Sequence, residues 1–202
     1  ELCLTFANTR YWRGRAEPTE TLVRPEDLLR WAAENAGFDA DTAARLHGKA
    51  VTRGAEKWLE QAIELREALF RVFARIAASN APASGDLDLL NLELRAAPAR
   101  NLVADSSRGL AWRVRSPTLQ LPDLLAAVLW SAADLLVRDA AQTIRQCANA
   151  ECQRLFIDRS KGGTRRWCDM GACGNRAKAS RHYQRKKLAT VPLQDTGKKR
   201  QA

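Results

Sequence analysis

Two pairs of cysteines near the end of the chain decide its fold there: Cys147-Ala-Asn-Ala-Glu-Cys152 and, fifteen residues later, Cys168-Asp-Met-Gly-Ala-Cys173. Thiolates are soft ligands, and four of them close a tetrahedral site around zinc. Each pair has four residues between its cysteines, at the wide end of the spacing in zinc knuckles. The spacing predicts one structural zinc ion per chain, held by Cys147, Cys152, Cys168 and Cys173.

A pair of disulfides and a set of four unrelated core thiols are the other interpretations of these cysteines. Disulfides are typical of oxidising compartments and small secreted domains, and no stretch of the chain has the pattern of a secretory signal. Unrelated core thiols would have apolar neighbours, whereas these lie among Asn, Glu, Arg, Gly and Asp. The metal interpretation is therefore favoured, and disulfides rank second.

The segment around the second pair predicts a hairpin followed by a basic helix. Leu155–Ile157 is expected to form a short strand and Lys161–Gly163 a turn, giving a zinc-bound hairpin. A helix is expected from about Asn175, with Lys178, Arg181 and Arg185 along one face. The predicted DNA-binding residues are the basic ones of this helix and of the preceding arm: Arg165, Arg166, Arg176, Lys178, Arg181, Arg185, Lys186 and Lys187.

Two motifs resemble known families. Cys173-Gly-Asn-Arg176, preceded by Arg166-Trp167-Cys168-Asp169-Met170, resembles the CGNR zinc-finger family of bacterial regulators. The stretch Leu4-Thr-Phe-Ala-Asn8-Thr9-Arg10 resembles the opening of the ABATE domain, the usual partner of that finger. Members of this family are regarded as stress-induced transcription regulators, so the resemblance implies DNA binding and a sensing role for the N-terminal domain.

The positive charge is confined to one end of the chain. From residue 144 onward there are fifteen Lys and Arg against four Asp and Glu, a net charge of +11. Residues 1–143 hold 18 basic and 19 acidic side chains, a net charge of −1. Such asymmetry predicts a polyanion partner for the C-terminal end alone, and double-stranded DNA is favoured. RNA or ribosome binding and a protein-interaction module are the alternatives, since charge alone does not separate them.

The predicted fold is mainly α with a small β component. It consists of a helical N-terminal domain with a β-hairpin, at residues 1–143, and a four-cysteine finger with its basic helix, at 144–190. A disordered basic tail is expected at 191–202. Apolar periodicity and end signals predict the N-terminal helices over about 25–36, 41–51, 55–79, 86–95 and 123–146. Residues 101–105 and 110–115 predict the hairpin, residues 21–24 a short strand, and residues 1–10 either a strand or a short helix.

Three local details follow from the same patterns. Glu67 and Arg71 are four apart and are expected to pair, as are Asp134 and Arg138. Cys3 is expected to be a buried hydrophobe. The helix over 123–146 is expected to run into Cys147 without a linker, which would couple the finger to the first domain.

The loop that begins at Tyr11 mixes aromatic rings with guanidinium groups. A solvated loop is the favoured interpretation, and contact with an anionic ligand or a partner is the alternative. Because the ABATE resemblance implies sensing, we hypothesise that a small-molecule pocket is bordered by Asn8, Thr9, Trp12 and Arg13, and that the domain forms a homodimer.

Catalysis is not predicted. The sequence has no Gly-rich phosphate loop and no arrangement of Ser, His and Asp typical of a nucleophilic triad. Four thiolates also make a closed zinc site, whereas a catalytic zinc keeps one position open. The longest apolar run, residues 124–137, is shorter than the roughly 20 residues that span a bilayer. A cytoplasmic, nucleoid-associated DNA-binding regulator without a membrane partner is therefore expected.

Overall fold

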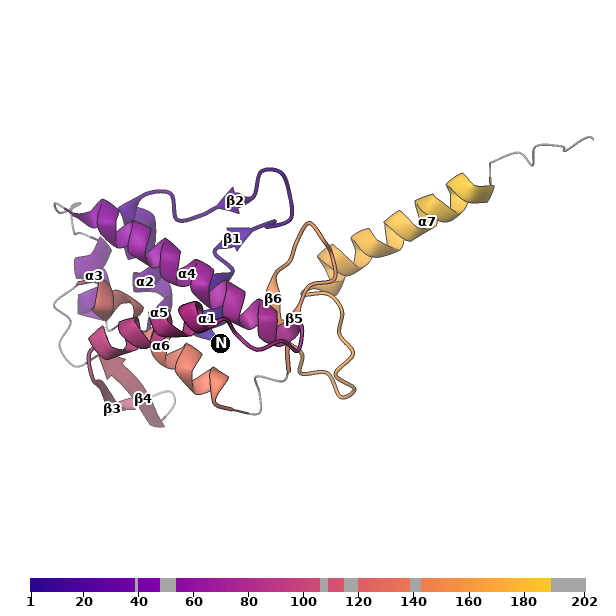
Figure 1. Ribbon diagram of the computed structural model, residues 1–202. Helices are drawn as coiled ribbons and strands as arrows, with labels where there is room; N and C mark the ends of the chain where they lie inside the picture. The colour runs from indigo at the N-terminus through magenta and orange to yellow at the C-terminus, as the bar shows by residue number, and fades with distance from the viewer. Residues whose placement is uncertain (39, 48–53, 106–108, 115–119, 139–142, 190–202) are drawn as a thin grey trace, which may run out of the picture. The chain divides into compact units, whose positions relative to one another are not determined.

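The computed structural model describes residues 1–38, 40–47, 54–105, 109–114, 120–138 and 143–189 (Figure 1). The predicted disordered tail lies outside these residues, as do the side chains of Arg185 and Lys187. The chain divides into two compact units, Glu1–Cys168 and Asp169–Ala202. The predicted class, mainly α with small β-hairpins and a C-terminal cysteine cluster, is confirmed. The boundaries predicted for the domains stay a prediction.

The first unit contains six helices and three two-stranded antiparallel ribbons among its described residues. The ribbons pair β1 with β2, β3 with β4, and β5 with β6. The elements in chain order are α1 Leu2–Ala7, β1 Arg10–Tyr11, β2 Thr19–Glu20, α2 Pro25–Asn35, α3 Ala40–His47, α4 Ala55–Ala77, α5 Ser84–Ala96, β3 Arg100–Asp105, β4 Gly109–Val114, α6 Leu121–Leu136, β5 Ile144–Gln146 and β6 Leu155–Ile157.

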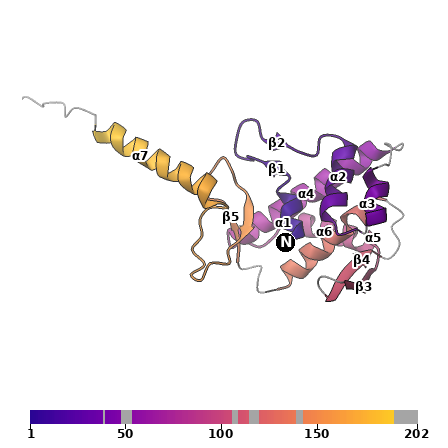
Figure 2. The same cartoon turned by 180° about the vertical axis from the view of Figure 1, so that it is seen from behind.

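Helix α4 is the centre of the core. Its side chains Leu65, Leu69, Val72 and Phe73 are fully buried and recur with the helical period, as predicted. The helix packs against α1, α2, α5 and α6, and it also contacts β5 and β6 (Figure 1). Figure 2 shows the same unit from behind, with the β3–β4 hairpin beside α6, in agreement with the contacts between β4 and α6.

The start of the chain is a helix, which resolves the choice between strand and helix. Cys3, Leu4, Phe6 and Ala7 are buried, a spacing that places them on one face of a helical turn. Cys3 is fully buried, as predicted, and burial raises the pKa of its thiol to about 11. The helix ends at Asn8, and the residues that follow reach the first cysteine pair.

The strand predicted at residues 21–24 is wrong. The strand lies two residues earlier, at Thr19–Glu20, and pairs with Arg10–Tyr11. The backbone N–H groups of Val23 and Arg24 instead donate to the carboxylate of Asp27 at 3.2 and 2.9 Å. This carboxylate caps α2, so the groups that a strand would use are already bound.

The continuous helix predicted over 123–146 is also wrong. Helix α6 ends at Leu136, and Ile144–Gln146 forms strand β5, which pairs with β6. Ile144 is β-branched, which favours a strand, and it is buried in the core. The first cysteine therefore follows a strand, and the finger is not joined to α6 by a rigid helical entry.

Of the two predicted ion pairs, Glu67 with Arg71 does not form, and Asp134 with Arg138 forms only at long distance. Glu67 pairs with Arg13 at 2.6 Å and with Arg66 at 2.9 Å, while Arg71 pairs with Asp86 at 2.6 Å. The expected pair of Glu67 with Arg71 is wrong, because Arg13 and Arg66 bind the Glu67 carboxylate and Asp86 of α5 binds Arg71. Asp134 does approach Arg138, at 4.0 Å, but its main partner is Arg100, at 2.9 Å.

None of the helices in the described part of the chain combines the length and the apolar character that crossing a bilayer needs.

Candidate metal centre

The four predicted ligands come together in the structure. The Sγ atoms of Cys147, Cys152, Cys168 and Cys173 all lie within 4.8 Å of one another. The Sγ atoms of Cys152 and Cys168 are 3.7 Å apart. In a tetrahedron with zinc–sulfur distances of about 2.3 Å, neighbouring sulfurs are about 3.8 Å apart. The donor set and its spacing therefore fit a metal ion with four thiolate ligands.

The β5–β6 ribbon positions the first cysteine pair. Cys147 follows β5 directly, and its N–H donates to the carbonyl of Arg154 at 2.8 Å, which extends the ladder by one bond. The turn then closes when the N–H of Cys152 donates to the carbonyl of Asn149 at 2.9 Å. Gln153, which has a positive φ of 54°, then leads the chain back toward β6. The pair is held by the two strands on either side of it.

The hairpin predicted between the two cysteine pairs is wrong in its pairing. Leu155–Ile157 is a strand, as expected, but its partner is Ile144–Gln146, so the hairpin encloses the first pair. The segment before the second pair makes one backbone hydrogen bond to this hairpin, in which the N–H of Ala148 donates to the carbonyl of Arg166 at 2.8 Å. A local turn at Lys161–Gly163 does form, since the Gly163 N–H donates to Ser160 at 3.1 Å.

Asp158 organises the loop that leads to the second pair. Its buried carboxylate accepts hydrogen bonds from the Ser160 hydroxyl at 2.6 Å, the Ser160 N–H at 2.9 Å and the Arg165 N–H at 2.8 Å. These bonds, the hydroxyl of Ser160 first, lower the pKa of Asp158. Arg165 in turn donates to the carbonyls of Trp167, at 2.8 Å, and Cys168. The loop is thus fixed just before the third ligand.

The fourth ligand lies in the second compact unit, on a single π-helical turn η2, Met170–Gly174, which continues into α7, Asn175–Ala189. Asp169 caps this turn, because its carboxylate accepts the Ala172 N–H at 2.6 Å and its carbonyl accepts the Gly174 N–H at 3.0 Å. Cys173 is buried. The helix predicted from Asn175 is confirmed.

The electrostatics of the cluster also favour a cation. Burial raises the pKa of the Cys168 thiol above its ordinary value, and the neighbouring Cys152 and Cys147 raise it further. Four thiolates at this spacing repel one another, and a divalent cation at their centre removes that repulsion. Zinc is the ion that most commonly takes four cysteine ligands in a closed site.

Two family models match the chain in the predicted order. Residues 1–139 match the family ABATE, described as "Putative stress-induced transcription regulator". This chain belongs to the ABATE family. Residues 143–186 match the CGNR zinc finger, so both resemblances seen in the sequence are confirmed. A comparison with curated proteins found no match.

The basic residues predicted to contact DNA lie on the CGNR finger, except Lys187, which follows it directly, and they are exposed where their side chains are described. Arg176, Lys178, Arg181 and Lys186 project from α7, a helix with no acidic residue. Arg165 is also exposed, but its guanidinium is bound within the loop and lies 4.9 Å from the Phe156 ring. Arg166 lies 5.3 Å over the Trp167 ring. Their contacts with DNA stay a prediction.

A contact that the sequence did not reveal joins the ABATE opening to the first cysteine pair. The amide of Asn8 donates to the Leu155 carbonyl at 2.8 Å and accepts the Leu155 N–H at 3.0 Å, and all of these groups are buried. Six residues later, the Gly14 N–H donates to the carbonyl of Glu151 at 3.1 Å. Arg15 pairs with the Glu151 carboxylate at 2.9 Å. Residues 8–15 thus hold the cysteine hairpin; we call them the clamp segment.

The remaining residues of the hypothesised ligand pocket also bond within the protein. Thr9 donates to the Phe6 carbonyl at 2.8 Å, and Arg13 pairs with Glu67. Trp12 has a φ of 54°, and the Arg15 guanidinium lies 4.0 Å over its ring. A ligand pocket at these residues stays a prediction; the structure assigns them internal contacts.

A buried arginine on α4 contacts the clamp segment. The side chain of Arg66 is 1% exposed and forms two bonds to the Glu20 carboxylate, at 2.6 and 2.7 Å. It also lies 3.4 Å from the Thr9 hydroxyl. Burial works to raise the pKa of Glu20, but the hydrogen bond from Arg66 and that from the Leu22 N–H outweigh it, so the pKa is lowered. The ion pair joins β2 to α4, and Thr9 connects it to the clamp segment.

Proposed function

We propose that this protein is a transcription regulator that binds double-stranded DNA through its CGNR finger, with one structural zinc ion held by the four cysteines. The observation that carries the proposal is the four-cysteine cluster followed directly by a helix that is basic and has no acidic residue. Four protein ligands leave no open position on the metal, so a structural role is proposed rather than a catalytic one.

The proposed role of zinc is to hold the two halves of the finger together. Loss of the ion would free the second pair from the first, because the described backbone bonds between them are few. With zinc bound, the start of α7 is fixed at Cys173, and its arginines can enter the major groove. Arginine binds the O6 and N7 atoms of guanine with two hydrogen bonds, while lysines contact phosphates without reading sequence.

Duplex DNA is favoured over single-stranded RNA by the aromatic content of the helix. Proteins that bind single strands stack bases on exposed aromatic rings. Among the described side chains of α7, Tyr183 is 75% exposed and His182 meets it edge to face, with ring centroids 6.4 Å apart. One such pair on a fifteen-residue basic helix is a small stacking surface.

The ABATE domain is proposed to sense a small molecule or to form a homodimer. A twofold dimer would present two fingers to a palindromic site. A sensing domain could change DNA affinity only by binding unequally to two arrangements of the finger. Such a regulator would act in the cytoplasm at the nucleoid.

Binding of labelled duplex DNA and single-stranded RNA at matched salt tests the DNA-binding proposal. Replacing Arg181 with alanine should weaken duplex binding by about 1–3 kcal/mol if this arginine reads a base. Replacing Lys186 with alanine should weaken binding to all sequences evenly and lower the salt slope by about one. Lys57→Ala, an exposed lysine on α4, is the matched control and should have no effect. Equal or tighter binding of RNA would replace the DNA proposal by the RNA alternative.

A further inference from the structure

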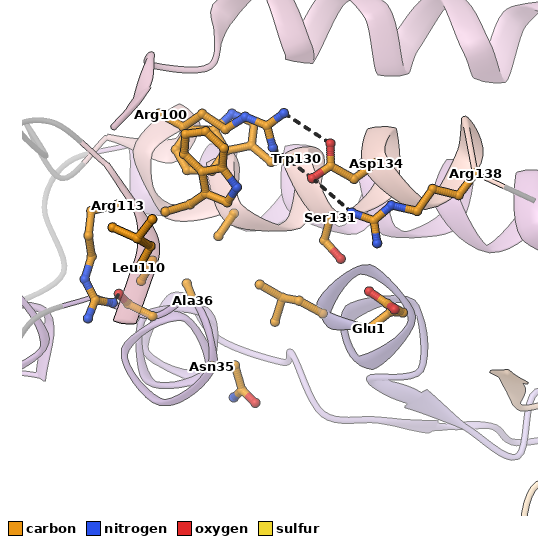
Figure 3. Close-up of a pocket in the computed structure, with 15 residues that line it drawn as sticks. Glu1, Asn35, Ala36, Arg100, Leu110, Arg113, Trp130, Ser131, Asp134 and Arg138 are labelled. Atoms are coloured by element: carbon orange, nitrogen blue, oxygen red, sulfur yellow. Dashed lines mark hydrogen bonds and ion pairs between the residues drawn. The ribbon is translucent and has the colours of Figure 1, made fainter. Parts of the chain in front are cut away.

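The ABATE domain contains a pocket that shares no residue with the metal centre. Its volume is about 610 Å³, within the range of small-molecule sites. The start of α1, the end of α2, the β3–β4 hairpin and one side of α6 line it. Figure 3 shows the polar and aromatic side chains that these elements contribute.

One wall of the pocket is aromatic and open to solvent. Trp112 and Leu110 on β4 are 51% and 61% exposed, although large apolar side chains are usually covered. Trp130 on α6 lines the same pocket (Figure 3). The Arg100 guanidinium lies 4.6 Å over the Trp112 ring and covers part of it. The remaining surface of the two indoles and of Leu110 is flat and apolar, so a ring placed against it would remove much of it from water.

Another wall carries more positive than negative charge. The Asp134 carboxylate forms two hydrogen bonds with Arg100, at 2.9 and 3.1 Å, and lies 4.0 Å from Arg138 (Figure 3). Arg113, on β4, donates to the carbonyl of Gly37. Three guanidinium groups thus line a pocket whose carboxylates are Asp134 and Glu1.

The hydrogen-bonding capacity of this wall exceeds what Asp134 can use. Each guanidinium has five N–H donors, whereas Asp134 has two oxygens, both bound to Arg100. Arg138 reaches Asp134 only at 4.0 Å, and its side chain is 60% exposed. A second carboxylate could therefore bind at Arg138 with charge-assisted hydrogen bonds and leave the Arg100 pair in place.

We propose that this pocket binds a small aromatic carboxylate, with its ring against the wall formed by Trp112 and Trp130 and its carboxylate on Arg138. The inference rests on the sensing role proposed for the ABATE domain and is independent of DNA binding. A cationic ligand fits less well, because Arg100 already neutralises Asp134. A long aliphatic ligand would leave the flat indole surfaces unmatched.

Titration calorimetry on the full chain tests the proposal, with naphthalene-2-carboxylate as the probe and its neutral carboxamide as the matched compound. A ligand of this size that binds with the efficiency usual for small molecules would have a Kd of about 1 mM or lower. The carboxamide should bind at least about tenfold more weakly, since it lacks the charge that Arg138 would recognise.

Two pocket variants and two matched controls locate the site. Arg138→Gln and Trp112→Ala should each weaken binding of the carboxylate by about fivefold or more. Arg30→Gln removes an arginine of similar exposure, paired with Asp27 on α2, and Leu102→Ala removes the exposed residue opposite Trp112 that does not line the pocket. Both controls should bind like the parent protein.

Three outcomes would overturn the proposal. They are no binding of naphthalene-2-carboxylate up to about 10 mM, equal binding of the carboxamide, and equal effects of the pocket and control variants. The titration contains no DNA, and the DNA-binding assay contains no carboxylate. Failure of one proposal can therefore be distinguished from failure of the other.

Discussion

Replacing Gly14 with alanine should weaken the metal centre, although Gly14 is no ligand. A Cβ atom at this position would lie 1.8 Å from the carbonyl oxygen of Ala150 and 2.7 Å from the side-chain nitrogen of Gln153. Ala150 lies inside the turn between Cys147 and Cys152. The clash is with backbone, so either this turn or the clamp segment must move. The hydrogen bond from the Gly14 N–H to the Glu151 carbonyl would stretch or break with it.

The size of the effect follows from these two changes. Forcing an extra methyl group into a packed site costs about 1–3 kcal/mol. Loss of one backbone hydrogen bond costs about 1 kcal/mol more. The free energy of unfolding should thus fall by about 2–4 kcal/mol. Because the turn carries two of the four ligands, zinc affinity should fall by about tenfold to a hundredfold, as is usual when groups that orient ligands are disturbed.

Competition with a chromogenic chelator measures the zinc affinity, and urea unfolding measures the stability. Gly85→Ala is the matched control, because a Cβ atom there meets nothing within 4 Å and the residue lies in helix α5. It should leave zinc affinity unchanged and stabilise the protein by about 0.5–1 kcal/mol. If Gly14→Ala retains the zinc affinity and the stability of the parent, the clamp segment does not support the metal centre.

Three further changes test neighbouring parts of the same arrangement. Asn8→Ala leaves the buried N–H and C=O of Leu155 without partners and should cost about 2–4 kcal/mol in urea unfolding. Cys168→Ser should abolish zinc binding, measured by elemental analysis, and should lower the unfolding midpoint of the whole first unit, because β5 and β6 belong to its core. The lowered pKa of Glu20 adds stability above its unfolded value, which is lost as the pH falls through the folded value. At pH 7 Glu20→Gln should lower the free energy of unfolding, because it removes the charge that pairs with Arg66. Below about pH 5 the stability of this variant should fall less steeply with pH than that of the parent, because the variant has no carboxylate to protonate at position 20.

Features set by neighbouring residues could be predicted from the sequence. Helix α4 follows from its apolar period, and α2 from Pro25 and the acidic residues that follow it. The β3–β4 hairpin follows from two short runs joined by a turn with Gly109, which has a φ of 77°. The cysteine cluster was predicted because metal chemistry fixes which residue types must meet, even where the chain between them is irregular.

Features set by distant partners could not be predicted in this way. Ile144–Gln146 looks like the end of a helix until its partner strand, Leu155–Ile157, is placed beside it. The Glu67 carboxylate had a suitable arginine four residues away, but Arg13 reaches it from the clamp segment. The role of Asn8 depends on a residue 147 positions later. Such contacts leave no periodic trace in the sequence, because each involves a single pair of side chains or strands.

The end of α6 at Leu136 changes how a signal could pass from the ABATE domain to the metal centre. A continuous helix into Cys147 is absent, and helix α1 offers a shorter connection. Leu2, near its start, lines the pocket, and Asn8, at its end, holds strand β6 beside the first cysteine pair. A ligand that displaced α1 would act on both, provided that it binds the two arrangements unequally. Linkage then requires reciprocity: the factor by which the carboxylate changes zinc affinity must equal the factor by which zinc changes carboxylate affinity. Proximity along α1 does not by itself establish coupling. A factor clearly different from one, found in both measurements, would establish that the pocket and the metal centre are coupled.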